Sequence, residues 1–390
     1  MKQTLLMMLL LVSVLSLVAQ EDNVPEPNLR YGGKGWELSY GENYLMTLEW
    51  RLQFRFAGIS GQQTDFYVQD EDNVNSTFAL QRARLKVGGH VYQPYLKYYL
   101  EYDFPSNNLM NWVMTIDKYK GLQVKIGQWK INYNTERYVS SGKQQFVDRS
   151  IANRYFTFDR QIGAMIQGEL FDGQVGSSMY HVGVFNGTGR GAVNESNDYL
   201  WLARYQWNFS RTQAKMSFGD LERSQVSKGF LAVSAATNQS AYTSFSSSGG
   251  GELPGFSPGL SRQYQINQLG VELMYKYKGF SLMNENHIKT IDDQVNGVET
   301  DLYGGYLMAG YFLSELISFV PEPLELIARY SMVSYSDAWE EKTTELTLGC
   351  NWFFSGHRNK LTFDFSFLNN VDFNPNDDGL RARVQWDVSF

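Results

Sequence analysis

Apolar and polar residues alternate one by one along most of the chain, and this pattern constrains the fold more than any other feature. From Tyr44 to Phe56 every second residue is apolar, whereas the residues between them are mostly polar or charged. The same split recurs over residues 96–104, 361–367 and 380–390. Because successive side chains of a β-strand point to opposite faces, this period of two predicts strands with one apolar and one polar face.

A soluble β-sandwich also alternates, so the residue types on the apolar face must separate it from a membrane barrel. The inner face of a sandwich favours Val, Ile and Leu, whereas aromatic residues crowd the apolar face here and make up 15% of the chain. The alternating stretches are ~10 residues long, the length that crosses a bilayer at a tilt. We therefore predict an all-β protein, a transmembrane antiparallel β-barrel in the outer membrane of a Gram-negative cell.

The first residues have the organisation of a secretory signal peptide. One lysine precedes an almost unbroken apolar run from Leu5 to Val18, and small and polar residues follow at Ala19 and Gln20. A run of this length is too short for a membrane-spanning helix. The sequence thus predicts a signal peptide over 1–19, an N-terminal periplasmic segment over 20–43 and the barrel over 44–390.

Counting the alternating stretches gives sixteen strands, an even number, as single-chain bacterial barrels have. The predicted strands are 44–56, 78–90, 95–103, 111–119, 121–129, 161–170, 177–186, 198–208, 228–237, 263–276, 279–291, 301–313, 324–335, 341–354, 359–370 and 379–390. Connections on the outer side are mostly long and those on the periplasmic side mostly short. The periplasmic connection 209–227 is an exception, because its nineteen residues are more than a short turn needs. A barrel of sixteen strands is wide enough to leave an aqueous channel.

The third outer loop, residues 130–160, carries the strongest local chemistry. It has an excess of basic residues in an acidic chain: Lys130, Arg137, Lys143, Arg149, Arg154 and Arg160. If the loop is exposed, these charges are simply solvated. If it folds into the lumen, they form a ring that selects anions, together with Arg82, Arg84 and Lys86 on the facing wall. Some inward arginines are also expected to pair with carboxylates across neighbouring strands.

Other functional classes find little support. The four histidines are scattered without the spacing of a metal site or a catalytic triad, so we expect no enzyme, metal or cofactor. A net charge of −7 gives no reason to expect nucleic acid as a partner. At the end of the chain, Trp386, Val388 and Phe390 share one face and are expected to be read by the barrel-assembly machinery.

Several short pieces, taken in order, resemble the bacterial phosphate-selective porin O and P family, as found in Bacteroidetes-type bacteria. They include Leu80–Leu85, Tyr98–Phe104, Ile126–Lys130, Val147–Ser150, Arg160–Gly163, Gly183–Asn186, Ala328–Ser331 and Gly349–Phe353. The resemblance implies a sixteen-stranded barrel, a homotrimer, and a third loop folded into the channel as its constriction. It also implies a second role for Arg149 and Arg160, which lie in these pieces and could fix the loop to the barrel.

Together these features predict a porin, a passive diffusion channel for small hydrophilic solutes that prefers anions such as phosphate. Its partners would be outer-membrane lipid, the assembly machinery and small anions. The alternative is a structural or scaffolding barrel, one subunit of a larger outer-membrane complex, plugged by its own loops.

Overall fold

The computed structural model describes residues 26–33, 35–60, 76–192, 194, 198–210, 216–245, 250–335, 342–370 and 378–390. The predicted signal peptide lies outside these residues. No helix in these ranges is long and apolar enough to cross a membrane.

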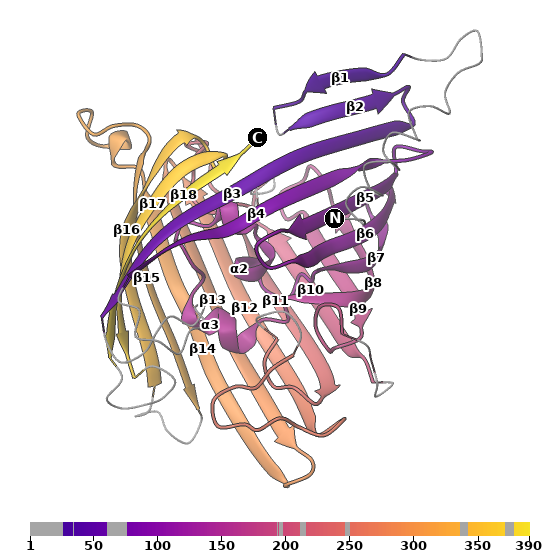
Figure 1. Cartoon of the computed structure of the whole chain (residues 1–390), viewed down its shortest axis with the longest axis vertical. Coiled ribbons are helices and arrows are strands. Elements are labelled where there is room, and N and C mark those ends of the chain that lie inside the picture. The colour runs from indigo at the N-terminus through magenta and orange to yellow at the C-terminus, as the bar shows by residue number, and fades with distance from the viewer. Residues whose placement is uncertain are drawn as a thin grey trace.

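Sixteen antiparallel strands form a closed barrel, as the alternation predicted (Figure 1). Each strand pairs with the next, and β18 pairs with β3 to close the wall. The strands are β3 (Tyr44–Ser60), β4 (Ser76–His90), β5 (Leu96–Asp103), β6 (Asn108–Tyr119), β7 (Leu122–Lys130), β8 (Arg160–Leu170), β9 (Ser178–Phe185), β10 (Leu200–Asn208), β11 (Lys228–Ser240), β12 (Tyr264–Tyr277), β13 (Phe280–Asp293), β14 (Val298–Tyr311), β15 (Leu324–Tyr335), β16 (Lys342–Ser355), β17 (Asn359–Asn369) and β18 (Gly379–Ser389).

The two faces of the wall follow the alternation in the sequence. On β17 and β18, Phe363 and Trp386 point outward and are 44% and 46% exposed. On the same two strands Asp364 and Arg383 point inward, are fully buried and form an ion pair with a 2.8 Å separation. An apolar face can meet lipid without an unpaired polar group, while the inward charges find partners inside the barrel.

The chain between β7 and β8 forms three short helices: α2 (Thr135–Tyr138), η1 (Ser141–Lys143) and α3 (Ile151–Phe156). Figure 1 shows α2 and α3 within the outline of the barrel, and most residues of the segment are buried. A further helical turn, η2 (Leu313–Glu315), lies in the connection between β14 and β15.

Two further strands precede the barrel. β1 (Asn28–Tyr31) and β2 (Trp36–Tyr40) form a hairpin, and β2 pairs with Tyr44–Leu48 at the start of β3. β-Structure therefore begins within the stretch predicted as a periplasmic segment, sixteen residues before Tyr44, although the closed wall itself begins at β3.

Candidate functional site

The segment between β7 and β8 is held first by carboxylates on β12 and β13. Glu285 accepts hydrogen bonds from the Asn134 side chain (3.0 Å) and from the backbone N–H of Glu136 (2.6 Å). Glu272 accepts one from the backbone N–H of Thr135 (3.2 Å). These acceptors take up donors of the first turn of α2, which has no side-chain cap of its own.

A second attachment lies near the closure of the barrel. The carboxylate of Asp148 lies 2.8 Å from a guanidinium nitrogen of Arg55 on β3 and 2.7 Å from one of Arg383 on β18. Burial alone would raise the pKa of Asp148, but Arg55 and Arg383 lower it well below its usual range. The carboxylate therefore stays ionised and links the loop to the two strands that close the wall.

Apolar packing fills the space between these attachments. Tyr133, Phe156 and Phe158 belong to one buried cluster that reaches inward-facing residues of β6–β15, and Phe245 and Leu253 of the outer connection after β11 join it. Val139 and Phe146 belong to a second cluster with inward residues of β11–β15. A large part of the lumen is thus packed like a protein core.

The described part of the connection 209–227, whose length parity does not explain, enters the same space from the periplasmic end. Phe218 is 2% exposed within the second cluster, and its N–H donates to the carbonyl of Lys143 (2.9 Å). The ring of His357 donates from Nε2 to the carbonyl of Phe218 (3.0 Å). Burial lowers the pKa of His357, so the ring is neutral at pH 7. Loops from opposite ends of the barrel therefore meet inside it.

The packing leaves a cavity of about 430 Å³ beside β3–β8, toward the periplasmic end. Seven basic and two acidic residues are among those that line it, which gives an excess of positive charge. The basic residues are Arg51, Arg84, Lys86, Lys130, Lys143, Arg160 and Arg358, and the acidic ones are Glu49 and Glu101.

Five of the residues singled out from the sequence line this cavity, and neighbouring groups contact them as well. Arg84 pairs with Glu101 (2.8 Å) and Asp103 (2.9 Å) on β5. Lys86 pairs with Glu49. Lys130 donates to the carbonyl of Arg137 (2.9 Å), and Arg160 donates to the Asn111 side chain (3.0 Å). Lys143 is exposed to the cavity.

The remaining basic residues occupy other places. Arg137 is nearly buried and pairs with Asp159 at 2.8 Å, and Arg82 donates to the Gln53 side chain (2.7 Å). Arg137 and Arg160 lower the pKa of Asp159 despite its burial, so this carboxylate too stays ionised.

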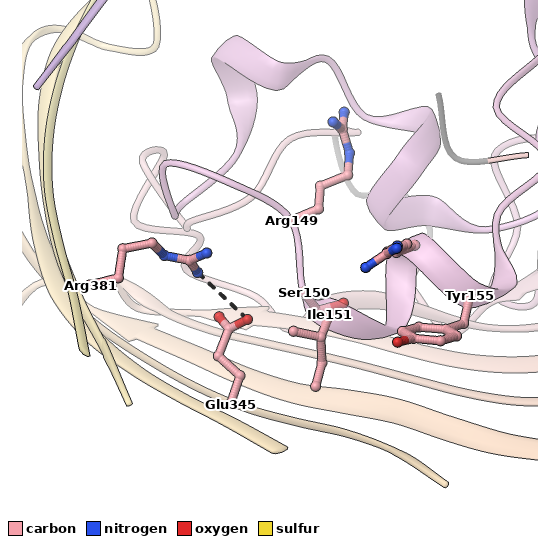
Figure 2. Close-up of a pocket in the computed structure, with 7 residues that line it drawn as sticks. Arg149, Ser150, Ile151, Tyr155, Glu345 and Arg381 are labelled. Carbon is pink, nitrogen blue, oxygen red and sulfur yellow. Dashed lines mark ion pairs between the residues drawn. The ribbon is translucent and has the colours of Figure 1, made fainter. Parts of the chain in front are cut away.

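Arg149 and Arg154 lie on the other side of the loop, around a small pocket with Arg381 and Glu345 (Figure 2). Arg149 also donates to the carbonyls of Glu136 (2.8 Å) and Val139 (3.0 Å). Arg381 lies 3.8 Å from Glu345, the ion pair drawn in the figure. Seven of the nine predicted basic residues thus lie in two regions, one on each side of the loop, whereas Arg82 and Arg137 line neither of them.

Sequence reasoning did not assign Arg51, Arg358 or His357 to the site, nor the connection 209–227. Arg51 has inward parity on β3, but many other charged residues share this parity, so the sequence did not distinguish it. The length of 209–227 was the available signal, because a periplasmic connection that only joins two adjacent strands needs few residues.

Comparisons with known proteins agree with this architecture. A sequence model described as phosphate-selective porin O and P matches residues 50–386. No curated protein matches the sequence.

Solved structures of other proteins are similar in fold. OmpT, an outer membrane protein of Vibrio cholerae, superposes with a TM-score of 0.58 at 11% identity, over 89% of this chain and 97% of that one. An anion-selective porin from Comamonas acidovorans gives a TM-score of 0.56 at 12% identity, over 88% and 99%. The channel DcaP of Acinetobacter baumannii gives 0.51 at 10%, over 88% and 97%.

Proposed function

Because this chain belongs to the phosphate-selective porin O and P family, an outer-membrane channel family, we propose that it passes small hydrophilic solutes and prefers anions such as phosphate. The observation that carries the anion preference is the cavity beside β3–β8, with its seven basic and two acidic residues. A charge in a narrow, low-dielectric passage is weakly screened and acts strongly on a passing ion. The anion-selective porin with the same fold adds support.

The two basic regions suggest a path for the anion. It would meet Arg149, Arg154 and Arg381 on the outer side of the loop and the cavity on the periplasmic side. Guanidinium groups suit phosphate because two N–H groups can donate to two of its oxygens at once. The third loop would then be the constriction between the two regions.

We further propose a homotrimer. On the side of the barrel from β5 to β10 several strands are short, with eight or nine residues in β5, β7, β9 and β10, near the lower limit for crossing the bilayer. Strands this short barely span the bilayer, so this side of the barrel is best covered by other copies of the chain. OmpT, which has the same fold, has a structure described as a trimer form. Light scattering of the protein in detergent measures the mass directly, and a monomeric mass would contradict the proposal.

Planar-bilayer recording in a salt gradient tests the channel and its selectivity together. Lys143→Glu should shift the reversal potential toward cation preference with conducting steps retained, because Lys143 is exposed to the cavity. Lys118→Glu is the matched control, since Lys118 is exposed on β6 beside Tyr95 and Tyr119 and does not line the cavity. Equal reversal potentials for the two variants would show that the ion-selectivity filter does not lie at the cavity.

One observation favours the second candidate, a structural barrel. Two apolar clusters occupy much of the lumen, and residues of an outer and a periplasmic connection contribute to them. A protein that folds and inserts but shows no conducting steps would support the structural role and exclude the porin.

A further inference from the structure

The hairpin β1–β2 lies at the periplasmic rim, next to the end of the last strand. β18 pairs with Arg51–Ser60 of β3, and Phe390 exchanges backbone hydrogen bonds with Trp50 (2.7 and 3.0 Å). β2 takes over from there and pairs with Tyr44–Leu48. Figure 1 shows the hairpin projecting from the end of the barrel at which the C-terminus lies. The hairpin thus extends the barrel wall beyond β18.

The register continues the outer face of the barrel onto the hairpin. Trp36 lies opposite Leu48, and Tyr40 lies opposite Tyr44, both of which have the outward parity of β3. Residues paired across an antiparallel ladder point to the same face of the sheet. The hairpin residues on this outward face are all apolar or aromatic: Leu29, Tyr31, Trp36, Leu38 and Tyr40.

The opposite face of the hairpin is polar. It carries Asn28, Arg30, Glu37 and Ser39, and Arg30 pairs with Glu37 at 2.9 Å. An amphipathic two-stranded sheet of this kind has one side suited to water and one suited to an apolar partner. At the turn of the hairpin, next to the end of β18, the Arg358 side chain from the β16–β17 turn donates to the hydroxyl of Tyr31 and so ties the hairpin to the barrel.

Three residues of the apolar side are as exposed as the wall that faces lipid, and Leu38 and Tyr40 are partly buried. Leu29, Tyr31 and Trp36 are 63%, 48% and 49% exposed, whereas Trp201 and Trp386 on the outer wall are 56% and 46% exposed. Contiguous exposed apolar surface marks a contact with a membrane or another protein. Trp and Tyr are enriched where the hydrocarbon of a bilayer meets its headgroups.

We propose that the hairpin is a membrane-interface anchor whose apolar face contacts phospholipid of the periplasmic leaflet. Continuity with the lipid-facing wall favours lipid over a protein partner, since the same sheet face runs from β3 onto β2 and β1 without a break. The inference rests on the position of the barrel in the outer membrane and is independent of what the channel carries.

Single-cysteine variants of the full chain, on a Cys350→Ala background and reconstituted in phosphatidylcholine vesicles, test this contact. Each cysteine carries an environment-sensitive fluorophore, and the quenchers are a nitroxide-labelled phospholipid and aqueous iodide. Leu38→Cys reports the apolar face, and Ser39→Cys, its neighbour on the polar face, is the matched control. Leu361→Cys, on the outer face of β17, shows that the barrel itself is inserted.

The lipid nitroxide should quench the label at position 38 about as strongly as at position 361 and several times more than at position 39. Iodide should quench mainly the label at position 39. Strong lipid quenching at 361 with none at 38 would overturn the anchor while leaving the barrel intact. Protection of position 38 from both quenchers would also overturn it and would indicate that a protein, such as a second copy, covers the face.

Discussion

At the scale of single residues, buried ion pairs decide where the loop between β7 and β8 lies. Asp148 is the clearest case, because Arg55 and Arg383 from different strands converge on one loop carboxylate. Removing that charge leaves the buried guanidinium of Arg55 without its carboxylate partner and that of Arg383 with Asp364 alone. Breaking a buried pair in this way costs about 3–5 kcal/mol. Water can do little to stabilise the two guanidinium charges, since both arginines are nearly fully buried.

Asp148→Asn is therefore expected to lower the temperature at which the folded barrel loses its fast electrophoretic migration in detergent. Asp172→Asn is the control, because its pair with Lys120 is exposed at the periplasmic turn and contributes little to stability. If Asp148→Asn unfolds at the same temperature as the wild type, the convergence on Asp148 does not hold the loop.

At the scale of elements, the connection 209–227 acts as an internal support for the loop. Its Phe218 packs with Phe146 and Val139 of the loop, and the two segments share a backbone hydrogen bond. Phe218→Ala should remove this packing at a cost of about 3–5 kcal/mol for a buried Phe. The connection would then detach from the loop more often. Single-channel conductance should rise because the water path widens on the periplasmic side.

Val226→Ala is the comparison for that experiment, since Val226 is in the same connection and is 60% exposed. Its conductance should match that of the wild type. A folded Phe218→Ala protein with wild-type conductance would show that the connection does not narrow the water path.

At the scale of the whole molecule, barrel closure depends on the last residues of the sequence. Phe390 exchanges two backbone hydrogen bonds with Trp50, and the residue is 47% exposed on the outer face with Trp386. We propose that Trp386, Val388 and Phe390 also form the signal that the barrel-assembly machinery reads.

Deleting Phe390 removes both the backbone pairing and the ring, whereas Phe390→Ala keeps the pairing. If the ring is the signal, both changes should lower the amount of protein in the outer membrane several-fold. Leu380→Ala, an exposed outward residue at the other end of β18, should leave it unchanged. If the deletion alone lowers the amount of protein in the outer membrane, barrel closure sets that amount and the aromatic ring is not the signal.

The alternation in the sequence determined the barrel: sixteen strands, their inward and outward faces, and their ends to within a few residues in most cases. It could do so because the period of two is a local property, which each strand displays on both of its faces. The outward or inward direction of each side chain in the wall then follows, as Phe363 and Asp364 illustrate.

Only the tertiary structure decided what lies inside the barrel. Asp148 meets Arg55 and Arg383 from 93 and 235 residues away, and the Gly142 region of the loop meets Arg51, which in turn pairs with Asp387 from 336 residues away. The loop and the connection 209–227 have no periodicity to show which face of the wall they approach. Their places depend on which inward charges and apolar side chains come together once β18 pairs with β3, the last strand of the barrel with the first.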